Sequence, residues 1–287
     1  MKGRRLIYLA MIVAVSVPVL LGFSLPPSRL VSAERMYSVV DEMQVNPGEV
    51  AFVWLDFGPG TLAENEPQAQ VLLEHLFRRR IPVVLLSQYQ QAEAALQRIP
   101  KEVAESLERE MPGQRWAYGE AWVNAGFRPG GQIFIQALVN APDLSKFLGR
   151  DVGGMPIAHY PNFSTIGGVE HIKLVGEITG LIGVLDNIIQ FFQKGGYRPT
   201  LVHGCTSITI PEAYIFVDSG QLKGLLEGIA GAAWYSEVLK QHHPLSDNSR
   251  LLVVNTALSS AHVVLIGLIV LGNIVALWGR RSRRPNG

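Results

Sequence analysis

The hydrophobic and polar positions divide the chain into two long apolar runs with a mixed region between them. Residues 6–25 carry no charged side chain, and residues 251–278 contain no Asp, Glu, Lys or Arg. About 20 apolar residues suffice to span the hydrocarbon core of a bilayer. The pattern therefore predicts that the chain is a membrane protein. It has an N-terminal transmembrane anchor in residues 1–25 and a second transmembrane helix in residues 251–279.

The region between the runs, residues 26–250, alternates short apolar segments with segments of helical period. Apolar segments near residues 50, 82, 172 and 200 read as strands, and a further short strand is expected within residues 116–127. Helices are expected at 28–47, 61–80, 90–110, 132–140, 181–194, 211–217 and 224–240. Residues 141–170 are rich in Gly, Pro and Asn and show no clear period, which indicates a loop region.

This alternation favours an α/β fold in which a mainly parallel sheet is covered by helices on both faces. The predicted strands are continuous apolar runs, as expected when both faces of the sheet are buried. We therefore expect a three-layer, Rossmann-like or flavodoxin-like domain between two transmembrane helices.

Positive charge is concentrated at the two ends of the chain. Basic residues precede the first apolar run and follow the second, in the tail 280–287, at Lys2, Arg4, Arg5, Arg280, Arg281, Arg283 and Arg284. By the positive-inside rule both ends are cytoplasmic, and the domain is extracytoplasmic at the plasma (inner) membrane. Since the net charge of the whole chain is +1, the domain itself is acidic. That balance argues against a nucleic-acid partner.

A cleaved signal peptide is the alternative interpretation of the first run. Val31-Ser32-Ala33 would supply small residues for cleavage. The uncleaved anchor is favoured because the apolar stretch is longer than a typical signal-peptide core and Ala33 lies eight residues beyond its end.

The stretch WLDFGPGTLAE, residues 54–64, raises the question of a ligand site. In open parallel sheets, ligands bind beyond the carboxyl ends of the strands. That rule selects a candidate ligand crevice made of Asp56, Gly58, Gly60, Thr61, Ser87, Glu177, Thr179, His203, Cys205 and Thr206.

Nucleotides are disfavoured at this crevice. The stretch lacks the glycine spacing of dinucleotide and phosphate loops. Asp56, Glu64 and Glu66 would also repel a phosphate at the helix start. No cofactor is therefore expected, while a polyol, an amine, a cation or a protein remains open. The structural alternative is a strand-to-helix turn, with Thr61 and Glu64 forming a capping box.

His203-Gly204-Cys205-Thr206-Ser207 holds the densest set of reactive side-chain types. His203 and Cys205 alternate along a strand end and would point to the same side. However, no nucleophile motif surrounds them, so a small buried cysteine is the favoured interpretation and Cys205 is not expected to be a nucleophile. The seven histidines lack zinc-ligand spacing, and no metal site is expected.

Two sets of residues indicate partners. Small residues in the predicted helix 224–240, namely Gly224, Gly228 and Ala232, suggest close packing against another surface, either the domain's own sheet or a partner. In the second apolar run Asn255, Ser259, His262 and Asn273 fall on one stripe at about 100° per residue. Polar groups within a bilayer face another helix or a cavity, here either the first span or a larger assembly.

These features favour a non-enzymatic scaffold or subunit of a membrane assembly, either a homo-oligomer or a complex with other membrane proteins. Two alternatives remain. One is a membrane-bound, hydrolase-like enzyme using Cys205, His203 and Asp56. The other is a binding module for a small polar ligand at the same crevice.

Overall fold

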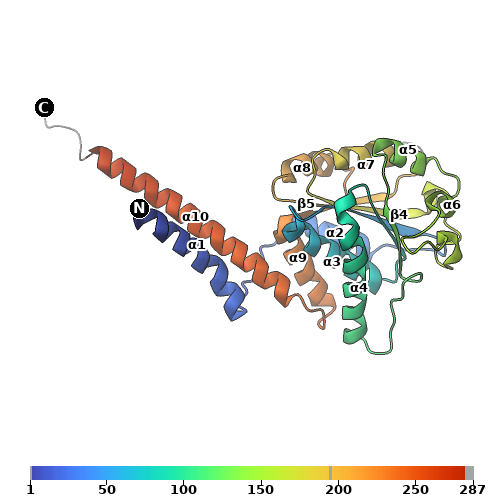
Figure 1. Ribbon diagram of the computed structural model, residues 1–287, viewed down its shortest axis with the longest axis horizontal. Coiled ribbons are helices and arrows are strands. Elements are labelled where there is room, and N and C mark those ends of the chain that lie inside the picture. The colour runs from blue at the N-terminus through green and yellow to red at the C-terminus, as the bar shows by residue number, and fades with distance from the viewer. Residues whose placement is uncertain (1, 194–195, 282–287) are drawn as a thin grey trace. The chain divides into compact units, whose positions relative to one another are not determined.

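The computed structural model describes residues 2–193 and 196–281 (Figure 1). The chain divides into two compact units. One is the segment Arg29–Ser246, and the other combines Met1–Ser28 with Asp247–Gly287. The end of the predicted helix 181–194 lies outside the described residues, as do Arg283 and Arg284 of the basic tail.

The first unit is built on a single six-stranded sheet in which every pairing is parallel. The strands run in the order β3-β2-β1-β4-β5-β6. Their bounds are β1 Val50–Asp56, β2 Val83–Ser87, β3 Trp122–Phe127, β4 Ile172–Thr179, β5 Thr200–Cys205 and β6 Gly224–Glu227. The predicted α/β class with a parallel sheet is therefore confirmed. Of the two expected strand orders, the observed one is that of the doubly wound dinucleotide-binding domains rather than that of flavodoxin.

Helices cover both faces of the sheet and give three layers (Figure 1). One face carries α2 Val31–Asp41, α3 Leu62–Arg78, α4 Glu93–Glu110 and α9 Gly228–His242. The other carries α5 Gln132–Val139, α7 Val184–Phe192 and α8 Ile210–Asp218. All seven residues of β1 and all five of β2 are buried, because each central strand lies between two layers of helices.

The remaining elements are short. The predicted loop region 141–170 contains α6 Leu144–Leu148 and two 3-10 turns, Ile157–His159 and Val169–His171. A third 3-10 turn, Gln90–Ala92, precedes α4.

The prediction of one helix over residues 224–240 was wrong at its start. Gly224–Glu227 forms the edge strand β6, and the helix begins at Gly228, whose φ of +56° turns the chain out of the strand. Helix α2 packs so closely over β6 that a Cβ on Gly224 would lie 2.4 Å from Cβ of Met36.

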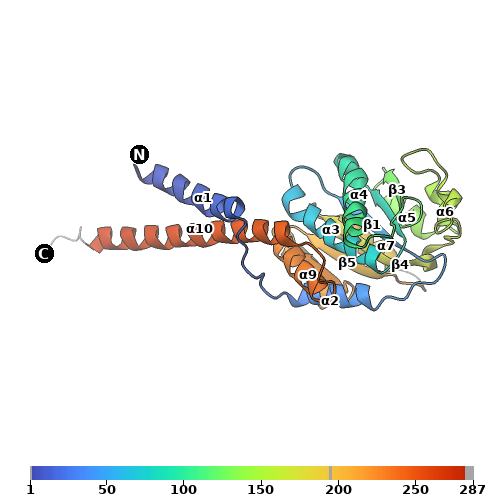
Figure 2. The same cartoon turned by 90° about the horizontal axis from the view of Figure 1, so that it is seen from below.

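The second unit contains the two terminal helices, α1 Lys2–Leu21 and α10 Ser249–Arg281. Arg4–Leu21 and Ser249–Val275 are long and apolar enough to cross a membrane, as the two runs predicted. The helices lie side by side (Figures 1 and 2). Helix α1 ends before residue 25 because Gly22 has a φ of +62°. The backbone N–H of Leu25 then donates to Oγ1 of Thr256 at 2.9 Å.

Candidate functional site

The candidate crevice lies where the strand order reverses, between β1 and β4. Asp56 at the end of β1 is in register with Thr179 of β4, and Thr179 is in register with Cys205 of β5. Two residues earlier along each strand, Trp54, Glu177 and His203 form the preceding row. Because side chains alternate between faces, both rows point to the same face, where Trp54 meets Phe192 of α7.

The structure thus brings the predicted residues of the strand ends together, but it buries them. Asp56 is 1% exposed, Glu177 0% and His203 3%. Ser87, Thr179, Cys205 and Thr206 are buried as well, and so is Gly58. Only Gly60 and Thr61 of the ten crevice residues reach solvent. The carboxyl edge of the sheet is a buried polar cluster there rather than an open crevice.

The Asp56 carboxyl group stabilises the turn that follows β2 through hydrogen bonds. Its Oδ1 accepts hydrogen bonds from Oγ of Ser87 at 2.6 Å and from the backbone N–H of Gln88 at 2.7 Å. Its backbone oxygen accepts from Oγ1 of Thr179 at 2.7 Å, which ties β1 to β4. Burial raises the pKa of Asp56, while the bonds from Ser87 and Gln88 oppose that shift.

Glu177 is the least satisfied group of the cluster. No N–H or O–H of the described residues donates to either of its carboxyl oxygens, and Nε1 of the neighbouring Trp54 also lacks an acceptor there. Burial raises the pKa of Glu177 well above its ordinary value, and the nearby charge of Asp56 raises it further. The Glu177 carboxyl therefore favours its neutral, protonated form more strongly than an ordinary glutamate does.

The environments of His203 and Cys205 favour a neutral imidazole and a protonated thiol. Nδ1 of His203 lies 2.7 Å from the backbone oxygen of Glu177 and must carry the proton, because a carbonyl oxygen only accepts. Burial lowers the pKa of His203 to about 4, so the ring is neutral at neutral pH. Burial likewise raises the pKa of the Cys205 thiol to about 12, which disfavours the nucleophilic thiolate.

The glycine turn of WLDFGPGTLAE serves the packing of the domain itself. A Cβ on Gly58 would lie 2.8 Å from Oε1 of Gln91 and 2.9 Å from Cε1 of Tyr89, so the missing side chain lets the turn after β2 approach. The predicted capping box was wrong. Thr61 occupies the N-cap position of α3 without a side-chain bond, and Glu64 instead accepts from the N–H and Oγ of Ser207.

Gln68 of α3 is a linking residue that the sequence analysis missed. Its Nε2 lies 2.7 Å from the backbone oxygen of Cys205, 3.1 Å from that of Leu226 and 2.9 Å from that of Gly228. It is fully buried and joins the ends of β5 and β6. In the sequence, the position of Gln68 on the apolar stripe of the predicted helix 61–80 was the sign that its side chain is buried and hydrogen-bonded.

The described residues show no metal-ligand group at this cluster, and a surface pocket lies away from it. Among the residues that the structure describes, no group of three or more His, Cys, Asp or Glu side chains is placed to hold a metal ion. A shallow pocket of about 320 Å³ lies at the opposite, amino edge of the sheet. It is lined by α4 and by the segment before β3, including Arg115, Trp116, Tyr118 and Trp122.

The small residues proposed as an interface are covered by the chain itself. Met36 covers Gly224, while Glu64 and Ser207 lie against Gly228. Ala232 is 0% exposed on α9. The close packing expected at these positions is therefore used within the domain.

Unlike the small residues, which the chain itself covers, most of the polar stripe of α10 points away from α1. The half-buried residues beyond the first turns of α10 are Ser260, Ala261, Val264, Gly267 and Leu268. At about 100° per residue they lie on the side opposite the stripe. Asn255 is buried, whereas Ser259, His262 and Asn273 are exposed in this unit.

The comparisons with known proteins assign no relative. No protein-family model, no curated protein and no solved structure matches the chain.

Proposed function

We propose that this protein is a membrane-anchored α/β domain that acts as a non-enzymatic scaffold or subunit of a membrane assembly. The proposal is supported by a contrast between the polar residues at the strand ends and the polar stripe of α10. The groups at the strand ends are buried and serve packing, whereas Ser259, His262 and Asn273 face outward from a helix suited to a bilayer. Such side chains in lipid favour a neighbouring helix as their partner.

The location we propose is the plasma (inner) membrane, with both termini cytoplasmic and the Rossmann-like domain outside the cytoplasm. Positive charge at both ends of the chain supports this orientation, because basic residues flanking membrane spans stay on the cytoplasmic side. Protease added to cells with a permeable outer envelope is expected to cut the domain, while tags at both termini stay protected. Cleavage only after lysis of the inner membrane would overturn this topology.

The assembly is tested by replacing Ser259, His262 and Asn273 with Leu. The variant is expected to insert normally and to lose particle mass in mild detergent. Interhelical polar contacts contribute only about 0.6–2 kcal/mol each, so the stripe orients packing more than it drives insertion. A matched control replaces Leu271 with Ile and Val275 with Leu, because these two residues are exposed and lie, at about 100° per residue, on the side of α10 opposite the stripe. A wild-type chain of monomeric mass with no co-purifying protein would contradict the proposal.

A further inference from the structure

Arg128 is a half-buried cation at the carboxyl end of β3. It follows the strand directly and is the only charged residue between Glu120 and Asp143. Its Nη2 donates to the backbone oxygen of Arg150 at 2.9 Å, while its Nε is buried and has no acceptor among the described residues. Burial lowers the pKa of Arg128, and no acid opposes that shift. A charge that is partly removed from water in this way is unfavourable until an opposite charge pairs with it.

Arg150 adds a second guanidinium group to the same part of the surface. Its backbone oxygen is the acceptor for Arg128, and its own Nη1 donates to the backbone oxygen of Gly154. The Arg150 side chain is exposed. Within residues 2–193 and 196–281, neither arginine forms an ion pair with an acid. Both guanidinium groups therefore bond to backbone oxygens that carry no full negative charge.

The segment 150–154 is fixed against β3, which is an edge strand of the sheet. The backbone N–H of Val152 donates to the backbone oxygen of Asn124 at 3.0 Å. A Cβ on Gly126 would lie 2.8 Å from Cγ1 of Val152, so the missing side chain lets the segment approach the strand. The end of β3 and the segment 150–154 therefore form one surface, and both arginines belong to it.

The acid nearest to these arginines in the sequence, Asp151, is already bonded to other donors. Its Oδ1 accepts from the backbone N–H groups of Gly153 and Met155, both at 2.9 Å. Its Oδ2 accepts from the hydroxyl groups of Tyr118 and Tyr160, both at 2.7 Å. The Asp151 side chain is buried. These four bonds hold its carboxylate inside the loop, which leaves the charge of the two arginines to an external anion.

We propose that Arg128 and Arg150 bind an oxyanion, namely a carboxylate or phosphate group of a small ligand, at the carboxyl end of β3. The planar guanidinium fork matches the paired oxygen atoms of both groups. Ligands of open parallel sheets bind beyond the carboxyl ends of the strands. The first turn of α5, which follows the same loop, contains no acid that would repel an anion. The site lies two strands away from β1, and it depends on neither the membrane anchorage nor the assembly proposed above.

Isothermal titration calorimetry of the full chain in a non-ionic detergent tests this site. The probes are inorganic phosphate and succinate, in Tris buffer whose ionic strength is held constant with sodium chloride. Arg128→Gln and Arg150→Gln each remove one guanidinium group, and Arg128→Lys keeps the charge without the fork. The matched control is Arg109→Gln, which removes an exposed arginine of α4 and so makes the same change in net charge.

The wild-type chain is expected to bind at least one of the two anions saturably. Arg128→Gln and Arg150→Gln should each weaken that binding by at least about tenfold, the effect of losing a hydrogen bond to a charged group. Arg128→Lys should fall between Arg128→Gln and wild type, and Arg109→Gln should bind as wild type does. Binding of phosphate alone would identify a phosphate ligand, and binding of succinate alone would identify a carboxylate.

The proposal is wrong if the wild-type chain binds neither anion saturably. It is also wrong if either glutamine variant of the site folds and keeps the wild-type affinity, or if Arg109→Gln loses as much affinity as they do. Because Arg150 is exposed, Arg150→Gln is expected to fold even if Arg128→Gln does not, and its affinity then decides the outcome.

Discussion

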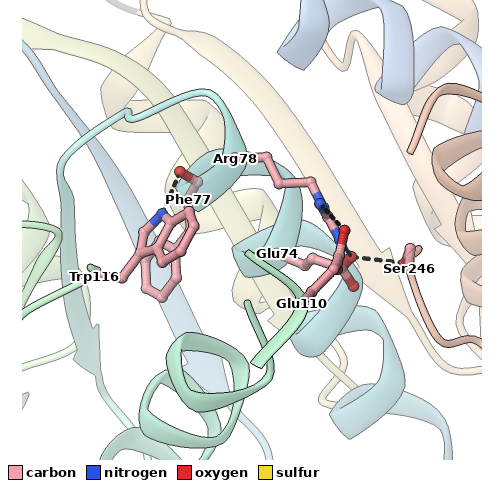
Figure 3. A network of polar contacts seen from close by, with 6 residues as sticks. All are labelled: Glu74, Phe77, Arg78, Glu110, Trp116 and Ser246. Atoms are coloured by element: carbon pink, nitrogen blue, oxygen red, sulfur yellow. Dashed lines mark hydrogen bonds and ion pairs between the residues drawn. The ribbon is translucent and has the colours of Figure 1, made fainter. Parts of the chain in front are cut away.

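Replacing Arg78 with Met is expected to lower the free energy of unfolding by about 3–5 kcal/mol, the range observed when one partner of a buried ion pair is removed. The Arg78 side chain is 3% exposed and lies between two carboxylates (Figure 3). Its Nη2 donates to Oε1 of Glu74 at 2.7 Å, and its Nη1 donates to Oε1 of Glu110 at 2.7 Å. Met retains most of the volume but leaves both acids without their cation.

The effect is expected to be large because this network joins three parts of the domain. Arg78 and Glu74 lie on α3, Glu110 ends α4, and Oγ of Ser246 donates to Glu74 at 2.7 Å just before the chain enters α10 (Figure 3). On the same helix end, Nε1 of Trp116 donates to the backbone oxygen of Phe77, which closes the segment before β3 over α3.

Denaturant unfolding in mild detergent, followed by tryptophan fluorescence, measures the loss. The matched control is Arg98→Met, since Arg98 also pairs with two acids, Glu66 and Glu102, but is 42% exposed. An exposed pair contributes about 0–1 kcal/mol, so that variant should remain close to wild type. A second variant, Arg78→Met with Glu110→Gln, should recover part of the loss. Equal stability of the two single Arg variants would show that the network is not a buried ion pair.

The sequence was sufficient to predict the elements that depend on local pattern. The apolar run 50–53 predicted a central strand because residues buried on both faces cannot alternate. The terminal helices followed from length and composition alone. Strand order did not follow, because pairing of β1 with β4 joins residues more than a hundred positions apart and leaves no local periodic signal.

The missed features depend on tertiary contacts. β6 has four residues and begins with a glycine that only the approach of Met36 explains, so local propensity favoured a helix. Glu64 satisfied a capping pattern in the sequence but bonds to Ser207, which is distant along the chain. Asp56, Thr179 and Cys205 lie at strand ends, as the sequence predicted, yet their burial depends on tertiary packing that leaves no local signal. The acids at positions 56 and 177, each within a strand that is buried on both faces, were the local signs of buried carboxyl groups.

Replacing Glu177 with Gln is expected to stabilise the protein increasingly as the pH rises. Burial raises the pKa of Glu177 in the folded state above its value in the unfolded chain. The unfolded chain therefore releases this proton from about pH 4.3 upward while the folded domain retains it. The protonated Glu177 carboxyl makes its full contribution to the free energy of unfolding below that pH. The contribution falls as the pH rises, until Glu177 also ionises in the folded domain. The slope reaches at most about 1.4 kcal/mol per pH unit for one proton.

Gln keeps the shape of the side chain but has no ionisable proton to lose. Wild type and Glu177→Gln should therefore have similar free energies of unfolding at about pH 4 and diverge above it. Asp56, whose pKa burial also raises, leaves a smaller slope of the same sign in the variant. Glu105→Gln, an exposed acid on α4, is the matched control and should parallel wild type. Parallel profiles for wild type and Glu177→Gln from pH 4 to 9 would show that Glu177 is ionised in the folded domain.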